Sequence, residues 1–379
     1  MIQPQRLHGK PANITRYYTV GDYYTKGGNE PSEWAGKLAA DLGLSGAVDP
    51  RVLRDLLAGK IGDQQLGRHR ANGENQHHPG WDFAVNAPKS VSIMALVVGD
   101  ERVLATHERA VTDAISYLEE QAQLRRRDEG KIIHETTGRI LVARFTEHGS
   151  RELDPHLHTH LVVLNMTNRE DGDPMVSLES RVMYGEQRVA GQIYRNALAF
   201  GLREAGYRID FDPRTGLFEM RGVPKELMET FSRRAEQIEE HAREHGLVGQ
   251  KAQRASFYAT RSAKVKIGYD TLKGQWHQRS GKFLGPLEQI AAAAREEEGG
   301  HRAPTDRIAA RAALFGLRQL ETAEAVNDLG DIIRTGLAAH VGEVRLQDIR
   351  PAIQNHEAVR KLLPTHEQTG DQILTRGRT

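Results

Sequence analysis

Residues 145–166 read FTEHGSRELDPHLHTHLVVLNM. Two stretches rich in β-forming residues, Ile132–Phe145 and Leu157–Met166, flank the acidic, proline-containing turn GSRELDPH, and this pattern predicts an antiparallel pair of strands. Successive side chains of a strand point to opposite faces, so His158 and His160 project from the same face. The two imidazoles therefore converge on one point of the predicted sheet.

A third histidine near this point favours a metal site. His148 ends the preceding strand, so it could bring a third nitrogen to the same place and leave open positions for water or substrate. A His-x-His pair is also common as a plain polar face of an exposed strand. His156 is more typical of a loop residue, although the spacing leaves it open as a ligand.

Composition narrows the chemistry. The 379 residues include 17 histidines and no cysteine, which excludes disulfides, thiolate nucleophiles, iron–sulfur clusters and cysteine-ligated zinc. Lys and Arg (52) balance Asp and Glu (51), so the net charge of +1 indicates no particular partner. No apolar run approaches the ~20 residues of a membrane helix and no signal peptide is evident, so we expect a cytoplasmic protein. At ~150 residues per domain, the length favours two domains.

The rest of the chain predicts an α+β fold, with a central antiparallel sheet, helices packed on it and a C-terminal all-helical extension. Expected elements are a strand or turn at Tyr17–Tyr24, helices at 33–43 and 52–57 (capped by Asp49), a loop at 67–80, a strand at 81–85, helices at 90–98, 101–124 and 188–204, a hairpin at 207–221 and a helix at 224–246. The predicted domains are residues 1–285 and 286–379, because Leu287–Leu363 is rich in Ala, Leu, Glu and Arg.

Two further groups could complete a reactive site. Asp82 lies in a predicted short strand, where a carboxylate could orient a metal-binding histidine, although it could equally be an ordinary strand-end residue. Four tyrosines stand near the N-terminus: Tyr17, Tyr18, Tyr23 and Tyr24. Tyrosines usually pack in cores, but beside a metal a tyrosinate can attack a phosphodiester in line and keep the bond as a phosphotyrosine.

With these motifs in place, the chain resembles the relaxase domain of the MobF-type conjugative relaxases, which are HUH endonucleases that nick plasmid DNA. The matching motifs are the two tyrosine pairs, EWAGKLAADLGLSGAVD, HHPGWDFAVNAPKSVS, SRELDPHLHTHLVVLNMT and TRSAK, in the family's order between Tyr17 and Gly285. Two spacings depart from the family pattern: four residues separate the tyrosine pairs, and the His148-to-His158 interval is about one residue shorter than the family's. The resemblance implies a palm-like sheet carrying the histidine strands.

The resemblance also implies roles for individual residues. Tyr17 corresponds to the nucleophile of the first cleavage, and Tyr18, Tyr23 and Tyr24 to its companions, of which one in the second pair would serve the terminating cleavage. Asp82 corresponds to the acid that orients a ligand histidine. His148, His158 and His160 correspond to the ligands of a divalent metal, with Mg²⁺ or Mn²⁺ expected.

The implied partners follow from the same resemblance. Single-stranded DNA at an origin of transfer is the expected substrate, and the candidate contacts are Arg68, Arg70, Lys89, Arg151, Gln192 and Arg195. Type IV secretion and coupling machinery and accessory DNA-binding proteins are expected partners, with passage into the recipient cell. The family continues into a helicase, yet the sequence holds no G-x-x-x-x-G-K-[ST] phosphate loop. A rolling-circle replication initiator and a non-catalytic metal-binding protein are the alternatives.

Overall fold

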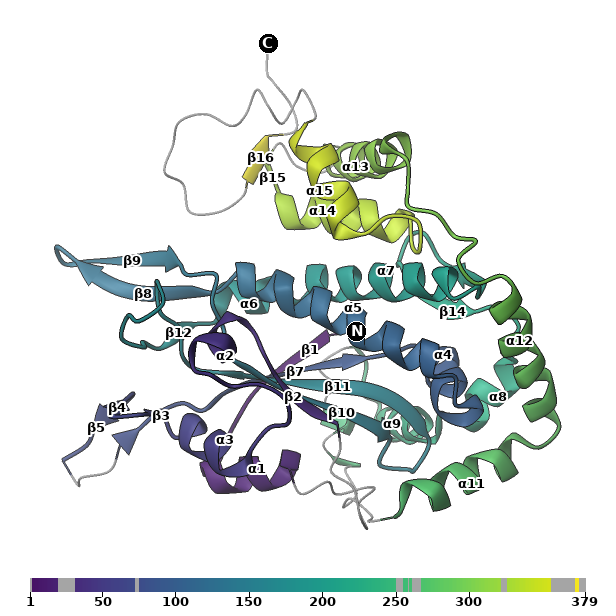
Figure 1. Ribbon diagram of the computed structural model, residues 1–379, viewed down its shortest axis with the longest axis horizontal. Helices are drawn as coiled ribbons and strands as arrows, with labels where there is room; N and C mark the ends of the chain where they lie inside the picture. Colours follow the sequence, from purple (N-terminus) through teal and green to yellow (C-terminus); the bar gives the residue numbers. More distant parts are fainter. Residues whose placement is uncertain are drawn as a thin grey trace.

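A central antiparallel sheet with helices on both faces organises the protein in the computed structural model (Figure 1). The structure describes residues 2–19, 31–71, 75–249, 255–257, 259–260, 267–321, 326–355 and 372–374. In this part of the chain, none of the helices is both long and apolar enough to cross a membrane. The α+β class and the C-terminal helices predicted from the sequence are confirmed.

Strands and helices occur in mixed order along the chain. The strands are β1 (Ile2–Arg6), β2 (Ser32–Ala35), β3 (Lys60–Ile61), β4 (Gln64–Gln65), β5 (Arg68–His69), β6 (Asn75–Gln76), β7 (Gly80–Asn86), β8 (Gln123–Asp128), β9 (Lys131–Thr136), β10 (Val142–Gly149), β11 (Pro155–Leu164), β12 (Leu178–Glu179), β13 (Ile209–Phe211), β14 (Phe218–Met220), β15 (Val326–Asp328) and β16 (Gln372–Leu374). The helices are α1 (Pro11–Thr19), α2 (Lys37–Asp41), α3 (Pro50–Leu57), α4 (Lys89–Ile93), the π-helix η1 (Met94–Val98), α5 (Glu101–Glu120), α6 (Arg181–Gly185), α7 (Gln187–Glu204), α8 (Lys225–Thr230), α9 (Arg233–Glu244), α11 (Tyr269–Ser280), the 3₁₀ turn η2 (Gly281–Phe283), α12 (Leu284–Glu296), α13 (Asp306–Glu321), α14 (Leu329–Ala339) and α15 (Leu346–Gln354).

The main sheet has the order β1-β7-β11-β10-β2, and every pair in it is antiparallel. The predicted pairing of the two histidine-motif strands is confirmed: in the β10–β11 register, Glu147 lies opposite His158 and Phe145 opposite His160. A register shift follows between Glu147 and Gly149, where the strands approach their connecting turn. This register decides which side chains share a face with the histidines.

The two faces of the sheet bury different clusters. Helices α5 and α7 cover one face, and α1 and α3 lie on the other (Figure 1). On β11, Leu161 and Val163 belong to the larger core under α5 and α7, whereas Val162 and Leu164 belong to the smaller core under α1. The even-numbered residues of β11, including both motif histidines, therefore face the side of α1.

The tyrosine segment is the clearest difference from the predicted elements. Tyr17 and Tyr18 lie on α1, so the predicted strand or turn is wrong there; Tyr23 and Tyr24 lie outside the described residues. Pro11 occupies the first helical position, where its missing N–H costs nothing. Ile14 and Tyr18, four residues apart, both face the core. This helical periodicity outweighs the β-preference of tyrosine.

The segment predicted as a helix at 33–43 is divided in two. Its beginning forms the edge strand β2, which pairs with β10, and only Lys37–Asp41 is helical. Gly36 separates the two parts with φ at 87°, and a Cβ there would lie 2.3 Å from the carbonyl oxygen of Ile140. The strand can therefore approach its neighbour and turn into a helix only because residue 36 is glycine.

Other predicted elements agree in kind and differ in extent. Asp49 caps α3 as predicted, since its Oδ1 accepts hydrogen bonds from the amides of Arg51 and Val52. The long helix predicted at 101–124 ends at Glu120, because Gln123 begins β8. The helix predicted from Pro224 is two helices, α8 and α9. Part of the loop predicted at 67–80 forms a short ladder between β5 and β6.

Of the C-terminal helices, α14 packs against α7, and α13 and α15 pack against α14. Asn196 of α7 donates from its amide to the carbonyl oxygens of Leu337 (3.0 Å), His340 (3.1 Å) and Val344 (2.8 Å). Residues of these helices share one hydrophobic cluster with α7, and α12 runs through the predicted boundary at residues 285–286. The short β15–β16 ladder adds a strand pair to this mostly helical region.

Candidate active site

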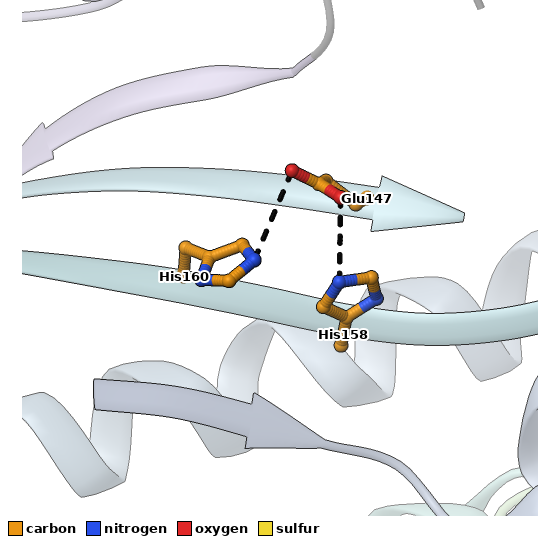
Figure 2. Close-up of side chains that lie close together, drawn as sticks. All are labelled: Glu147, His158 and His160. Atoms are coloured by element: carbon orange, nitrogen blue, oxygen red, sulfur yellow. Dashed lines mark ion pairs between the residues drawn. The ribbon is translucent and has the colours of Figure 1, made fainter. Parts of the chain in front are cut away.

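Two histidines and a glutamate meet on the α1 side of the sheet. The ligand atoms of Glu147, His158 and His160 all lie within 4.8 Å of one another, and all three residues are largely buried. Glu147 Oε2 lies 3.4 Å from Nε2 of His158, and Oε1 lies 3.8 Å from Nε2 of His160. Figure 2 shows the carboxylate of β10 facing both rings of β11. Two imidazoles and a carboxylate are a donor set suited to a divalent metal.

Each histidine is oriented through its other ring nitrogen. Nδ1 of His160 lies 2.7 Å from Oδ2 of Asp82, and Nδ1 of His158 lies 2.9 Å from the carbonyl oxygen of His156. A carbonyl oxygen only accepts, so Nδ1 of His158 is the donor in that bond. Such contacts fix the tautomer of a metal-binding imidazole and leave Nε2 available. The predicted role of Asp82 beside a ligand histidine agrees with this geometry.

The same carboxylate reaches a tyrosine. The hydroxyl of Tyr18 donates to Oδ2 of Asp82 at 2.9 Å, and its ring stacks on Phe145 and meets His160 edge-on. Burial raises the pKa of Tyr18 well above its ordinary value, and the charge of Asp82 raises it further. Burial alone would lower the pKa of His160, but the Asp82 carboxylate outweighs it and the pKa rises to about 9.

Tyr17 occupies a more open position. Its ring packs edge-to-face against Tyr18 at 4.9 Å between centroids, and it is half-buried where Tyr18 is only 4% exposed. The two tyrosines of the first pair therefore differ: one is locked against Asp82, and the other is accessible beside it.

His148 does not join the pair of motif histidines. Phe145 packs on Tyr18, whereas Thr146 bonds Thr159 on the opposite side of the sheet. Alternation along β10 thus places Glu147 on the α1 face and His148 on the other, where its ring lies 5.4 Å from that of Tyr269. Burial lowers the pKa of His148 to about 4.

Glu147 is not among the ligands predicted from the sequence, although two signals pointed to it. First, a side chain that meets His158 from the neighbouring strand must project from the same face of the sheet. Second, the His148-to-His158 interval is about one residue shorter than the family's, which moves the expected ligand position from 148 to 147. His156 also stays outside the group: its Nε2 bonds Oδ1 of Asn86 at 3.1 Å, and its ring stacks on His158.

The predicted DNA contacts lie in different places. Arg68 and Arg70 are exposed on and beside β5, and Arg70 bonds the amide oxygen of Gln76 at 2.8 Å. Arg151 is half-buried in the turn between β10 and β11. Lys89, Gln192 and Arg195 have internal bonds instead.

These internal bonds give the three residues structural roles. Lys89 donates to the carbonyl oxygen of Pro155 at 2.9 Å, and burial lowers its pKa to about 8. Gln192 is 2% exposed and donates to Asn196, while Arg195 donates to Gln192 and to the carbonyl of Thr215. Gln192 and Arg195 lie on α7, across the sheet from the metal group.

A buried network supports the histidine strand from below. Nε2 of His107, on α5, lies 2.9 Å from the hydroxyl of Thr159, and its Nδ1 lies 2.8 Å from the hydroxyl of Tyr194 on α7. Thr159 stands between the two motif histidines and points to the opposite face. The network therefore ties the centre of the site to both covering helices.

This network makes the fold sensitive to acid. Burial lowers the pKa of His107 to about 3, against ~6.5 in an unfolded chain. The neutral ring stabilises the fold fully above pH 6.5, and this contribution falls by about 1.4 kcal/mol per pH unit between 6.5 and 3. Between pH 7 and 5, we expect urea unfolding to show about 2 kcal/mol more loss of stability in the unmodified protein than in His107→Gln. An equal fall in the free energy of unfolding between pH 7 and 5 in the two proteins would contradict this expectation.

Comparison with known proteins identifies a family of relaxases. The TrwC relaxase family model matches residues 11–283. The multifunctional conjugation protein TraI of Escherichia coli K12 is 33% identical over 270 residues, which are 69% of this chain and 15% of that relative's length. A metal-free structure of the conjugative relaxase TrwC with oriT DNA has a TM-score of 0.67, with 34% identity over 75% of this chain and 99% of that one. A copper-bound TrwC–oriT structure has a TM-score of 0.68 at the same identity and coverage.

Proposed function

The chain belongs to the TrwC relaxase family, and on this basis we propose that it nicks one strand of DNA at an origin of transfer through a covalent phosphotyrosine intermediate. The observation that carries the proposal is the Asp82 carboxylate, which contacts a tyrosine hydroxyl at 2.9 Å and a metal-suited histidine at 2.7 Å. TraI and TrwC are described as conjugation proteins, and the TrwC structures contain oriT DNA. The chain spans only 15% of the length of the TraI relative, so the proposal concerns the nicking step.

Tyr17 is the nucleophile in this proposal. Its ring is accessible beside the site. Tyr18, by contrast, is buried, donates a hydrogen bond to Asp82 and has a raised pKa. In-line attack by the Tyr17 oxygen on the scissile phosphorus forms the phosphotyrosine and releases the 3′-hydroxyl of the neighbouring nucleotide. Tyr18 and His160 both contact Oδ2 of Asp82, so Tyr18 helps to hold the carboxylate in place. Tyr23 or Tyr24 would serve the terminating cleavage.

The donor set fits a divalent metal ion, with Mg²⁺ or Mn²⁺ proposed. His158 and His160 would hold it, with Glu147 facing both rings. A bound ion at this place polarises the phosphodiester and stabilises charge on its non-bridging oxygens. Asp82 keeps the proton of His160 on Nδ1, and Asp82, Glu147 and His158 are all buried.

A cationic cavity beside the site is proposed to hold the DNA strand. It has a volume of about 740 Å³ and is lined by three arginines and three histidines: Arg6, Arg68, Arg125, His8, His77 and His78. Arg6 pairs with Trp81, one residue before Asp82 on β7, so the cavity lies at the end of the strand that carries this carboxylate. No Asp or Glu is among its described lining residues. Arg70 and Arg151 are further proposed phosphate contacts.

The rolling-circle initiator is not favoured, because the matched relatives are conjugation proteins. Type IV secretion and coupling machinery, accessory DNA-binding proteins, a helicase and transfer from the donor cytoplasm to the recipient remain part of the proposal.

The test uses the full chain and single-stranded oligonucleotides that carry origin-of-transfer sequences. With Mn²⁺ or Mg²⁺, we expect a protein–DNA adduct that resists denaturant. With EDTA, we expect the adduct to disappear while DNA affinity, measured by fluorescence anisotropy, stays within about threefold, because most affinity comes from cationic contacts. Arg68→Ala should leave adduct chemistry intact but weaken DNA binding. The slope of log affinity against log salt concentration should fall in magnitude by about 0.7. Cleavage without any adduct would contradict the proposed chemistry, and loss of DNA binding in EDTA would contradict the division of roles.

A further inference from the structure

Glu147 is buried beside the two motif histidines and faces both of them. Its two carboxylate oxygens lie 3.4 and 3.8 Å from the Nε2 atoms of His158 and His160, and Glu147 itself is 3% exposed (Figure 2). We propose that Glu147 is the third protein ligand of the metal, so that two imidazoles and one carboxylate hold the ion and shift its selectivity toward Mn²⁺. This inference rests on the proposed function, which places a divalent metal at this point.

The hydrogen bonds of the rings support direct ligation. Nδ1 of His158 donates to a backbone carbonyl, so in the neutral ring Nε2 carries only a lone pair. Nδ1 of His160 contacts Asp82 in the same way. Metal ligation requires both Nε2 atoms to be deprotonated, and two lone pairs and a carboxylate then face one another in a buried space, which is favourable only with a cation among them. A divalent ion bound by all three groups satisfies this requirement.

The strand geometry explains why the carboxylate is the ligand and the neighbouring histidine is not. Glu147 pairs directly with His158 across the β10–β11 ladder, so their side chains project from the same face. The register shift comes only after Glu147. His148 points to the opposite face, beside Tyr269. Its replacement should therefore leave the metal untouched.

A carboxylate changes what the site selects. Imidazole suits Ni²⁺, Cu²⁺ and Zn²⁺, whereas carboxylate oxygen suits Mg²⁺ and Mn²⁺. Exchanging one of three imidazoles for a carboxylate therefore reduces the advantage that Ni²⁺ holds over Mn²⁺. The ratio of the Ni²⁺ and Mn²⁺ affinities is the quantity that reports this exchange, since it is independent of how much protein is active.

The experiment measures metal binding directly on the full chain after removal of metal. Mn²⁺ binding is followed by the loss of the free-ion EPR signal, and Ni²⁺ binding by calorimetry. We expect Glu147→Gln to weaken Mn²⁺ by about 10- to 100-fold, which is the loss typical of a disturbed metal site. His148→Ala is the matched control, one residue away, and should change Mn²⁺ affinity by less than about twofold. Glu147→His should raise the Ni²⁺/Mn²⁺ affinity ratio by at least about tenfold.

Circular dichroism of each variant guards against misfolding, because an unfolded chain with 17 histidines would also prefer Ni²⁺ to Mn²⁺. The inference is overturned if Glu147→Gln binds Mn²⁺ normally, if His148→Ala loses Mn²⁺ as Glu147→Gln should, or if Glu147→His leaves the ratio unchanged. The adduct assay on the same preparations separates the two proposals. An adduct with normal Mn²⁺ binding in Glu147→Gln refutes only the ligand, whereas the expected metal binding without any adduct refutes only the nicking function.

Discussion

Replacing Tyr17 with phenylalanine should abolish the covalent protein–DNA adduct, with its rate of formation falling by at least about 10³-fold. The physical reason is that the phenol oxygen is the atom that bonds to phosphorus, and phenylalanine removes it without disturbing the edge-to-face packing on Tyr18. DNA affinity should stay nearly constant, because the cationic cavity around Arg68 is intact. The measurement is the amount of denaturant-resistant adduct formed with a labelled origin oligonucleotide and Mn²⁺.

Tyr18→Phe is the matched control. It also removes one hydroxyl from the same helix, but that hydroxyl donates to Asp82 instead of attacking. The adduct should still form, at a rate reduced by about 10-fold or less, because Asp82 keeps its contact with His160. If the adduct disappears in Tyr18→Phe and survives in Tyr17→Phe, the buried tyrosine is the nucleophile and our assignment is reversed.

Replacing Asp82 with asparagine should lower the nicking rate by about 10²-fold or more. The carboxylate only accepts hydrogen bonds, so it keeps the proton of His160 on Nδ1 and leaves Nε2 for the metal. An amide NH₂ in its place can donate to Nδ1 and move the proton to Nε2, which removes a ligand. We therefore expect Mn²⁺ affinity to fall by about 10- to 100-fold along with the rate.

Asp210→Asn is the control for charge alone. It neutralises one carboxylate that pairs with Arg221 on an exposed hairpin, and it should leave both nicking and metal binding unchanged. Full nicking activity in Asp82→Asn would mean that Asp82 fixes neither the tautomer nor the tyrosine. Loss of rate with unchanged Mn²⁺ affinity would instead place its role on Tyr18 alone.

The sequence predicted the sheet and two of the three members of the metal group because both depend on local periodicity. The spacing of His158 and His160 and the strand around Asp82 are patterns of period two. The turn between the two β-rich stretches is recognised from its composition. The third donor was harder to predict, since it depends on cross-strand register. His148 is the residue type usually expected of a metal ligand. Glu147, however, lies directly opposite His158, so its side chain is the one that projects from the same face as the motif histidines.

Burial limited the remaining predictions. Lys89 and Gln192 look like solvent-facing groups in the sequence, yet both make internal hydrogen bonds. Lys89 bonds the distant Pro155, and Gln192 bonds Asn196 one turn further along α7, where the C-terminal helices cover it. The preference of tyrosine for strands predicts a strand or turn at the tyrosine segment, whereas the four-residue spacing of the buried Ile14 and Tyr18 fits the helix observed. Such outcomes depend on tertiary packing that a single sequence does not display.

The arrangement of the sheet edges sets an order for the assembly of the site during synthesis. One edge strand, β1, pairs with β7, and the other, β2, pairs with β10, so the first 35 residues supply both borders and the tyrosine helix between them. Neither border can form its ladder until its partner, some 75 to 110 residues further along, has left the ribosome. The tyrosine helix is thus synthesised well before β10 and β11, so a nascent chain that lacks these two strands has neither the proposed metal group nor the surface on which the helix packs.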